Sequence, residues 1–141
     1  MLTFRVLIID DDADDRELLR EVLQRDGIEP VLALESAQQV LAYLREIERD
    51  EDLPHLIVTD LNMQGMTGLE LLHALKSAER YRRIAVVIYS TSSYQKDVQR
   101  CLLAGANEYI TKPSNYAGLR TVSSSLAQNH LSAVHFPLSA R

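Results

Sequence analysis

Residues 4–19 read FRVLIIDDDADDRELL, and the order of residue types in this stretch indicates the fold class. The apolar run from Phe4 to Ile9 is rich in branched side chains and predicts a buried β-strand. Aspartates follow directly. From Asp14 to Asp26, apolar residues recur at the spacing of one helical face, at Leu18, Leu19, Val22 and Leu23. The stretch therefore predicts a strand that ends in acids and leads into an amphipathic helix.

The same alternation of strand and helix recurs along the rest of the chain. Further apolar runs predict strands at Val31–Leu34, His55–Thr59, Ile84–Tyr89 and Asn107–Thr111. Helices are predicted from the capping pairs Ser36 with Gln39 and Thr67 with Glu70, from the stripe of Val98, Cys101 and Leu102, and from Asn115 to about Gln128. Strands that alternate with helices through short connections form parallel sheets covered on both faces. We therefore predict an α/β fold with a doubly wound, five-stranded parallel sheet.

The composition is that of a folded globular domain of ordinary size. The 141 residues are 46% apolar and 25% charged, with a net charge of -5. The acidic balance disfavours direct nucleic-acid binding, which usually needs a basic face. No apolar run approaches the roughly 20 residues that span a bilayer, so we expect no membrane insertion. The single cysteine, Cys101, cannot form an internal disulfide, and a reducing, cytoplasmic location is expected.

Residues able to carry chemistry lie where the predicted strands end. Asp10 and Asp11 follow the first strand, Asp60 the third, Ser90 the fourth and Lys112 the fifth. Because parallel strands end at one edge of the sheet, where such sheets bind ligands, we expect these side chains to meet. Clustered carboxylates need a cation between them, and oxygen ligands suit Mg²⁺. A carboxylate can also be the nucleophile of phosphoryl transfer, with Mg²⁺ and Lys112 supplying positive charge.

Several neighbouring residues have a simpler interpretation. We interpret Asp12, Asp14 and Asp15 as residues of a helix N-terminus, where the macrodipole favours acids. Ser90 has the alternative of capping the next helix, but Ser92 or Ser93 is better placed for that. Ser90 therefore stays a candidate for the site.

Four segments, in this order, resemble the motifs of the response-regulator receiver family of two-component signalling. They are IIDDDADDRELL, VTDLNMQGMTGLELL, VVIYSTSS and GANEYITKP. The resemblance covers roughly residues 4–128 and implies a flavodoxin-like sheet with the strand order 2-1-3-4-5.

The resemblance also implies roles for the acids. Asp60 corresponds to the phosphoacceptor, and Asp11 to a direct ligand of Mg²⁺. Asp10 assists through water, and the carbonyl of Asn62 is a further metal ligand. Gln64 stands where the family often has proline, which fixes φ, so the loop after Asp60 is expected to be less rigid.

Three more roles follow from the resemblance. Ser90 corresponds to the switch hydroxyl and Lys112 to the lysine that contacts the phosphoryl group, with a cis Lys112–Pro113 bond directing it inward. Tyr109 corresponds to the switch aromatic; a half-buried strand tyrosine without a switching role is the alternative. Ser114 departs from the apolar residue that the family usually has there.

The expected function is phosphoryl transfer from a sensor histidine kinase or phosphotransfer protein to Asp60, with altered contacts to a downstream protein. Such a protein promotes only its own phosphorylation and dephosphorylation and has no external substrate. The alternative is a phosphorylation-independent scaffold on the same fold, supported by Gln64. An aspartyl phosphatase is disfavoured, because Asn62 stands where that chemistry needs a second acid.

The expected domain organisation is a receiver over residues 1–129 and a tail over 130–141. The tail resembles those of small receivers that work with phytochrome-type kinases. Two alternatives stay open for its apolar residues, packing against the domain or joining a homodimer.

Overall fold

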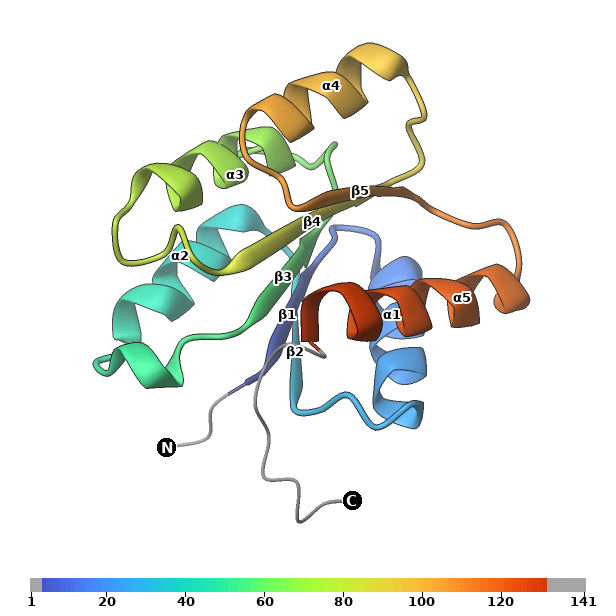
Figure 1. The fold of residues 1–141 in the computed structure, drawn as a ribbon, viewed down its shortest axis with the longest axis horizontal. Coiled ribbons are helices and arrows are strands. Elements are labelled where there is room, and N and C mark those ends of the chain that lie inside the picture. Colours follow the sequence, from blue (N-terminus) through green and yellow to red (C-terminus); the bar gives the residue numbers. More distant parts are fainter. Residues whose placement is uncertain (1–3, 132–141) are drawn as a thin grey trace.

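The protein, described here by a computed structural model over residues 4–131, has five parallel strands in the order β2-β1-β3-β4-β5 (Figure 1). The strands are β1 (Val6–Ile9), β2 (Val31–Leu34), β3 (Leu56–Thr59), β4 (Ala85–Ser90) and β5 (Glu108–Thr111). This confirms the predicted doubly wound, flavodoxin-like sheet. The predicted limits of β2 match the observed ones, and those of the other strands differ by one or two residues. The predicted tail, apart from its first two residues, lies outside the described residues.

Four helices connect the strands and a fifth follows β5, and together they cover both faces of the sheet. They are α1 (Ala13–Arg25), α2 (Ala37–Glu46), α3 (Gly68–Ser77), α4 (Gln95–Leu103) and α5 (Tyr116–Leu126). A 3₁₀ turn (Asp50–Asp52) precedes β3, and a π-helical turn (Ala127–Leu131) follows α5. Figure 1 shows α1 and α5 on one face, with α2, α3 and α4 on the other. No helix within residues 4–131 is long and apolar enough to cross a membrane.

Four of the five helices begin at side chains that accept hydrogen bonds from their first turns. Asp12 caps α1, Ser36 caps α2 and Asn115 caps α5. Thr67 and Glu70 form the predicted capping box of α3. These caps satisfy N–H groups that have no partner inside the helix.

Alternate residues of the strands pack into two separate cores. Leu7, Ile9, Ile57, Val86 and Ile88 face α2, α3 and α4. Val6, Ile8, Val58, Val87 and Tyr89 face α1 and α5. Since neighbouring side chains of a strand point to opposite faces, continuous apolar strands bury both faces at once.

Three details of the helices differ from the sequence-based expectation. Leu18 and Leu102, expected on buried stripes, are 48% and 47% exposed. Each lies at the edge of its stripe. In α1 the buried residues are Leu19, Val22 and Leu23, and in α4 the buried residue is Cys101. The N-cap of α4 is Tyr94, which makes no side-chain capping bond, rather than a serine.

Candidate functional site

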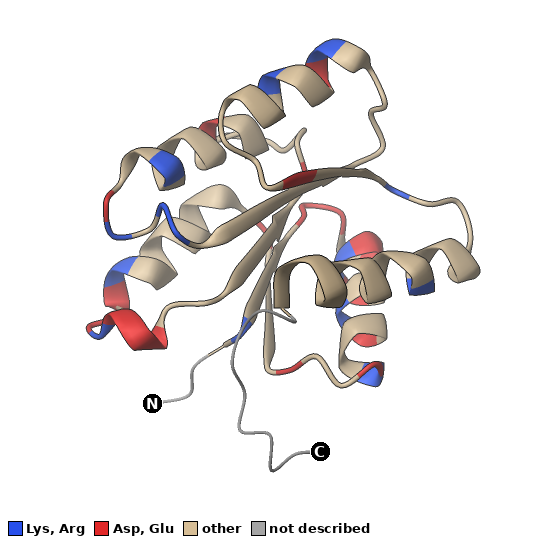
Figure 2. Ribbon diagram, viewed as in Figure 1, with Lys and Arg blue, Asp and Glu red and all other residues tan. Residues whose placement is uncertain are grey.

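The carboxyl edge of the sheet brings four of the predicted site residues together, namely Asp10, Asp11, Asp60 and Lys112. Hydrogen bonds continue the strand pairing beyond the strands: the Asp60 N–H donates to Ile9 at 2.9 Å, and the Lys112 N–H to Ser90 at 2.7 Å. These backbone contacts fix the point at which each chain leaves the sheet. Figure 2 shows acidic residues in the loop after β1 and at the start of α1.

Three carboxylates form a cluster at this edge. One oxygen each from Asp10, Asp11 and Asp60 lies within 4.8 Å of the other two. The Asp10 and Asp60 side chains are 3% and 12% exposed, whereas Asp11 is exposed. The cluster is therefore fixed on its inner side and open to solvent on the other, an arrangement that suits a divalent metal ion.

Lys112 reaches into the cluster from the end of β5. Its Nζ lies 2.7 Å from Asp10 Oδ2, 2.8 Å from Asp15 Oδ2 and 3.2 Å from Asp60 Oδ2. The lysine side chain is 8% exposed, and its ammonium lies 5.6 Å from the ring centre of Tyr89. All three N–H donors of the ammonium are thus directed at carboxylates.

The charges at the site do not balance. Burial raises the pKa of Asp10 to about 6, although hydrogen bonds from Lys112 and from the Asp12 N–H act in the opposite direction. Burial would lower the pKa of Lys112, but hydrogen bonds to Asp10 and Asp15 outweigh it and raise that pKa. Two further acids, Asp11 and Asp60, face the same space, so one lysine cannot neutralise the set. A divalent cation fits this donor set and its excess of negative charge.

The side chain of Asp60 is held in a defined orientation. Its Oδ1 accepts a hydrogen bond from the Leu61 N–H at 2.7 Å, while Oδ2 faces Lys112. The helix that follows also approaches closely, because a Cβ at Gly68 would lie 2.1 Å from the Asp60 carbonyl oxygen. The absence of a side chain at Gly68 thus lets α3 pack directly on the end of β3.

Asn62 and Gln64 are both exposed in the loop after Asp60. The N–H of Gln64 donates to Asp11 Oδ2 at 3.2 Å. A proline at this position would lack that donor. The departure from the expected proline therefore adds a contact between this loop and Asp11.

Ser90 and Tyr109 meet at the loop after β4. The Ser90 side chain is buried, and its Oγ accepts a hydrogen bond from the Ser92 N–H at 3.1 Å. The Tyr109 hydroxyl donates to the Ser92 carbonyl at 2.6 Å, and its ring is half-buried. Ser92 Oγ in turn donates to Asp97 Oδ2 at 2.7 Å in the first turn of α4. A chain of contacts therefore runs from the site to α4.

Asp15 is the site residue that sequence reasoning missed. The interpretation as a helix N-terminus is correct for Asp12, whose side chain accepts from the Asp15 N–H. The carboxylate of Asp15, however, forms an ion pair with Lys112. No sequence pattern marks this contact, because it depends on how the first turn of α1 lies beside the end of β5.

The expected cis Lys112–Pro113 bond is wrong. The cis peptide bond among residues 4–131 is Glu29–Pro30. Lys112 nevertheless points into the site, because its backbone N–H is anchored on Ser90 and its side chain is drawn toward carboxylates.

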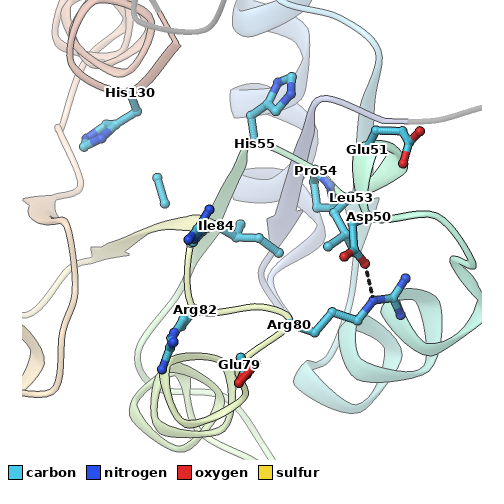
Figure 3. A pocket seen from close by; sticks show the side chains of 12 residues that line it. Asp50, Glu51, Leu53, Pro54, His55, Glu79, Arg80, Arg82, Ile84 and His130 are labelled. Atoms are coloured by element: carbon cyan, nitrogen blue, oxygen red, sulfur yellow. Dashed lines mark hydrogen bonds and ion pairs between the residues drawn. The ribbon is translucent and has the colours of Figure 1, made fainter.

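A separate cavity lies away from these residues, at the opposite edge of the sheet. It has a volume of about 860 Å³ and is lined by segments that precede β3 and β4, including Pro54, His55 and Ile84. Figure 3 shows the Arg80–Asp50 ion pair beside it, with His130 across the opening. Since none of the strand-end acids line it, the cavity is not the site of their chemistry.

Comparison with known proteins agrees with this geometry. The response regulator receiver domain family matches residues 6–123. The two-component response regulators ARR6 and ARR15 of Arabidopsis thaliana are both 35% identical to the chain, over 86% and 82% of its length. The chain spans 68% of ARR6 and 58% of ARR15.

Two solved structures share the fold over nearly the whole chain. The Mn²⁺-bound response regulator Rcp1 is 28% identical, with a TM-score of 0.79 over 94% of this chain and 97% of its own. The phosphorylated cyanobacterial phytochrome response regulator RcpA is 28% identical, with a TM-score of 0.82 over 96% and 99%. The chain belongs to the response-regulator receiver family of two-component signalling.

Proposed function

We propose that this receiver accepts a phosphoryl group on Asp60 from a phosphohistidine of a sensor kinase or a phosphotransfer protein. The observation that carries the proposal is the position of Asp60 Oδ2, which lies 3.2 Å from Lys112 Nζ within the cluster of three acids. Phosphoryl transfer depends on positioning and on positive charge near the transferred oxygens. Both are provided here by groups that the sheet fixes.

Asp10, Asp11, Asp60 and the carbonyl of Asn62 would hold Mg²⁺ in this proposal. The bound ion would supply positive charge that draws the carboxylate and the incoming phosphoryl oxygens together. An ionised oxygen of Asp60 forms a bond to phosphorus as the bond from phosphorus to the histidine nitrogen breaks. The imidazole keeps the electron pair of that bond. Lys112 donates hydrogen bonds to the transferred oxygens.

Ser90 and Tyr109 form the switch of this proposal. The Ser90 hydroxyl would turn from its backbone contact with Ser92 to a phosphoryl oxygen. Because Tyr109 is bound to the Ser92 carbonyl, a shift of this loop alters the surface of α4 and β5. Phosphorylation thereby biases a two-state equilibrium that a downstream protein reads.

The proposal also covers the cellular location of the protein, its lack of direct nucleic-acid contact and its domain limits. A cytoplasmic location agrees with the free, buried Cys101, and the net charge of -5 argues against direct nucleic-acid contact. We assign residues 1–129 to the receiver and 130–141 to a tail, whose role in a homodimer is tested by measuring size with and without phosphorylation.

Incubation with Mg²⁺ and acetyl phosphate tests the phosphoacceptor. The wild type is expected to gain the mass of one phosphoryl group, and Asp60→Asn none. Asp14→Asn also removes one negative charge, at an exposed residue of α1, and should gain the same mass as the wild type. No gain on the wild type would contradict the proposal and favour a phosphorylation-independent scaffold. An equal gain on Asp60→Asn would contradict it by placing the phosphoryl group on another residue.

A further inference from the structure

Lys112 has a third carboxylate partner, Asp15, which is no part of the proposed metal site. Asp15 Oδ2 lies 2.8 Å from Nζ, nearer than the Asp60 oxygen at 3.2 Å. An ammonium has three N–H donors, and Asp10 takes one more of them. A phosphoryl oxygen that needs a donor from Lys112 must therefore displace one of these carboxylates.

Asp15 is the partner that can be displaced at the least cost. Its side chain is 40% exposed, against 3% for Asp10 and 12% for Asp60. A cavity of about 250 Å³ lies beside the ion pair and is lined by both Asp15 and Lys112. A carboxylate released into this space is hydrated, whereas a released Asp10 would remain buried and unpaired.

We propose that Asp15 is a positioning residue that holds the Lys112 ammonium toward α1 and competes with the phosphoryl group on Asp60 for its N–H donors. This inference rests on the proposed function. In the resting protein, Asp15 stabilises the inward position of the lysine. In the phosphorylated protein, the bond to Asp15 is exchanged for one to the phosphoryl group, so the first turn of α1 is coupled to the chemistry at Asp60.

Affinity for beryllofluoride in the presence of Mg²⁺, followed by titration of amide chemical shifts, tests the competition. Asp15→Asn removes the charge that competes for Lys112 and should bind beryllofluoride roughly two- to fivefold more tightly, as expected for a partly exposed ion pair. Asp14→Asn is the matched control, since it removes one charge from the same helical turn at an exposed residue and should bind as the wild type does. Asp15→Glu keeps the charge and should return the affinity toward the wild-type value.

The outcomes separate this inference from the proposed function. A wild type that does not respond to beryllofluoride would overturn both. A wild type that responds, with Asp15→Asn no tighter than Asp14→Asn, would overturn the role of Asp15 alone. Far-UV circular dichroism of each variant checks that the change in affinity does not come from lost structure.

Discussion

Asp10 is the most buried carboxylate of the site, with a side chain 3% exposed between Lys112 and the N–H of Asp12. Burial raises its pKa from 3.8 to about 6. The folded protein therefore binds this proton more tightly than the unfolded chain does. Stability contributed by this group is present at low pH and is lost as the pH rises from about 4 to about 6.

Asp10→Asn should accordingly stabilise the metal-free protein at pH 7, by roughly 1–3 kcal/mol. The amide keeps an acceptor for Lys112 but removes the buried charge. Urea unfolding in a chelator, compared with the wild type at pH 7 and near pH 4, measures the effect, which should shrink toward zero at the lower pH. A variant that is less stable than the wild type at pH 7 would show that Lys112 fully compensates the charge of Asp10.

The junction of β3 and α3 depends on one position, Gly68. A helical glycine replaced by alanine usually gains helix propensity, up to about 1 kcal/mol. Here the added Cβ would lie 2.1 Å from the Asp60 carbonyl oxygen and 2.9 Å from Leu61 Cα, and both are backbone atoms. The sheet fixes the backbone on this side. Steric strain should therefore outweigh the gain in helix propensity, and the substitution should lower the free energy of unfolding.

Gly68→Ala should therefore destabilise the protein by about 1–3 kcal/mol and reduce phosphorylation at Asp60. His73→Ala, at an exposed position of the same helix, is the control and should change stability by less than about 0.5 kcal/mol. Chemical denaturation and the acetyl phosphate reaction measure the two effects. Unchanged stability would mean that α3 can move away from β3 without loss.

The elements also show what the sequence could and could not predict. The strands followed from apolar runs and their order from the family resemblance, and the capping box at Thr67 marked the start of α3 within one residue. The meeting of Asp10, Asp60 and Lys112 followed from a parallel sheet alone. Asp15 was missed because its role depends on how the first turn of α1 lies against the end of β5, a tertiary contact without a sequence period. Exposed Leu18 was misassigned for the same reason.

At the scale of the whole molecule, negative charge is concentrated at one edge of an already acidic protein. The chain carries a net charge of -5, and Asp10, Asp11 and Asp60 lie together at this edge, where Asp10 and Asp60 share Lys112 with Asp15. Their mutual repulsion opposes folding, because in the unfolded chain residues 11 and 60 are far apart. A cation that binds only the folded arrangement should therefore link metal concentration to global stability.

Mg²⁺ should raise the free energy of unfolding by about 1.4 kcal/mol for every tenfold increase in its concentration above the dissociation constant. The dependence is expected because no comparable cluster exists in the unfolded chain. Asp11→Asn removes an exposed acid that we propose as a metal ligand, and it should flatten this dependence of stability on Mg²⁺, while Asp14→Asn should leave the dependence intact. Thermal unfolding across a series of Mg²⁺ concentrations, at constant ionic strength set with NaCl, separates specific binding from screening. An equal response of both variants would assign the stabilisation to general screening, and the three acids would then be a cost of folding with no ion to offset it.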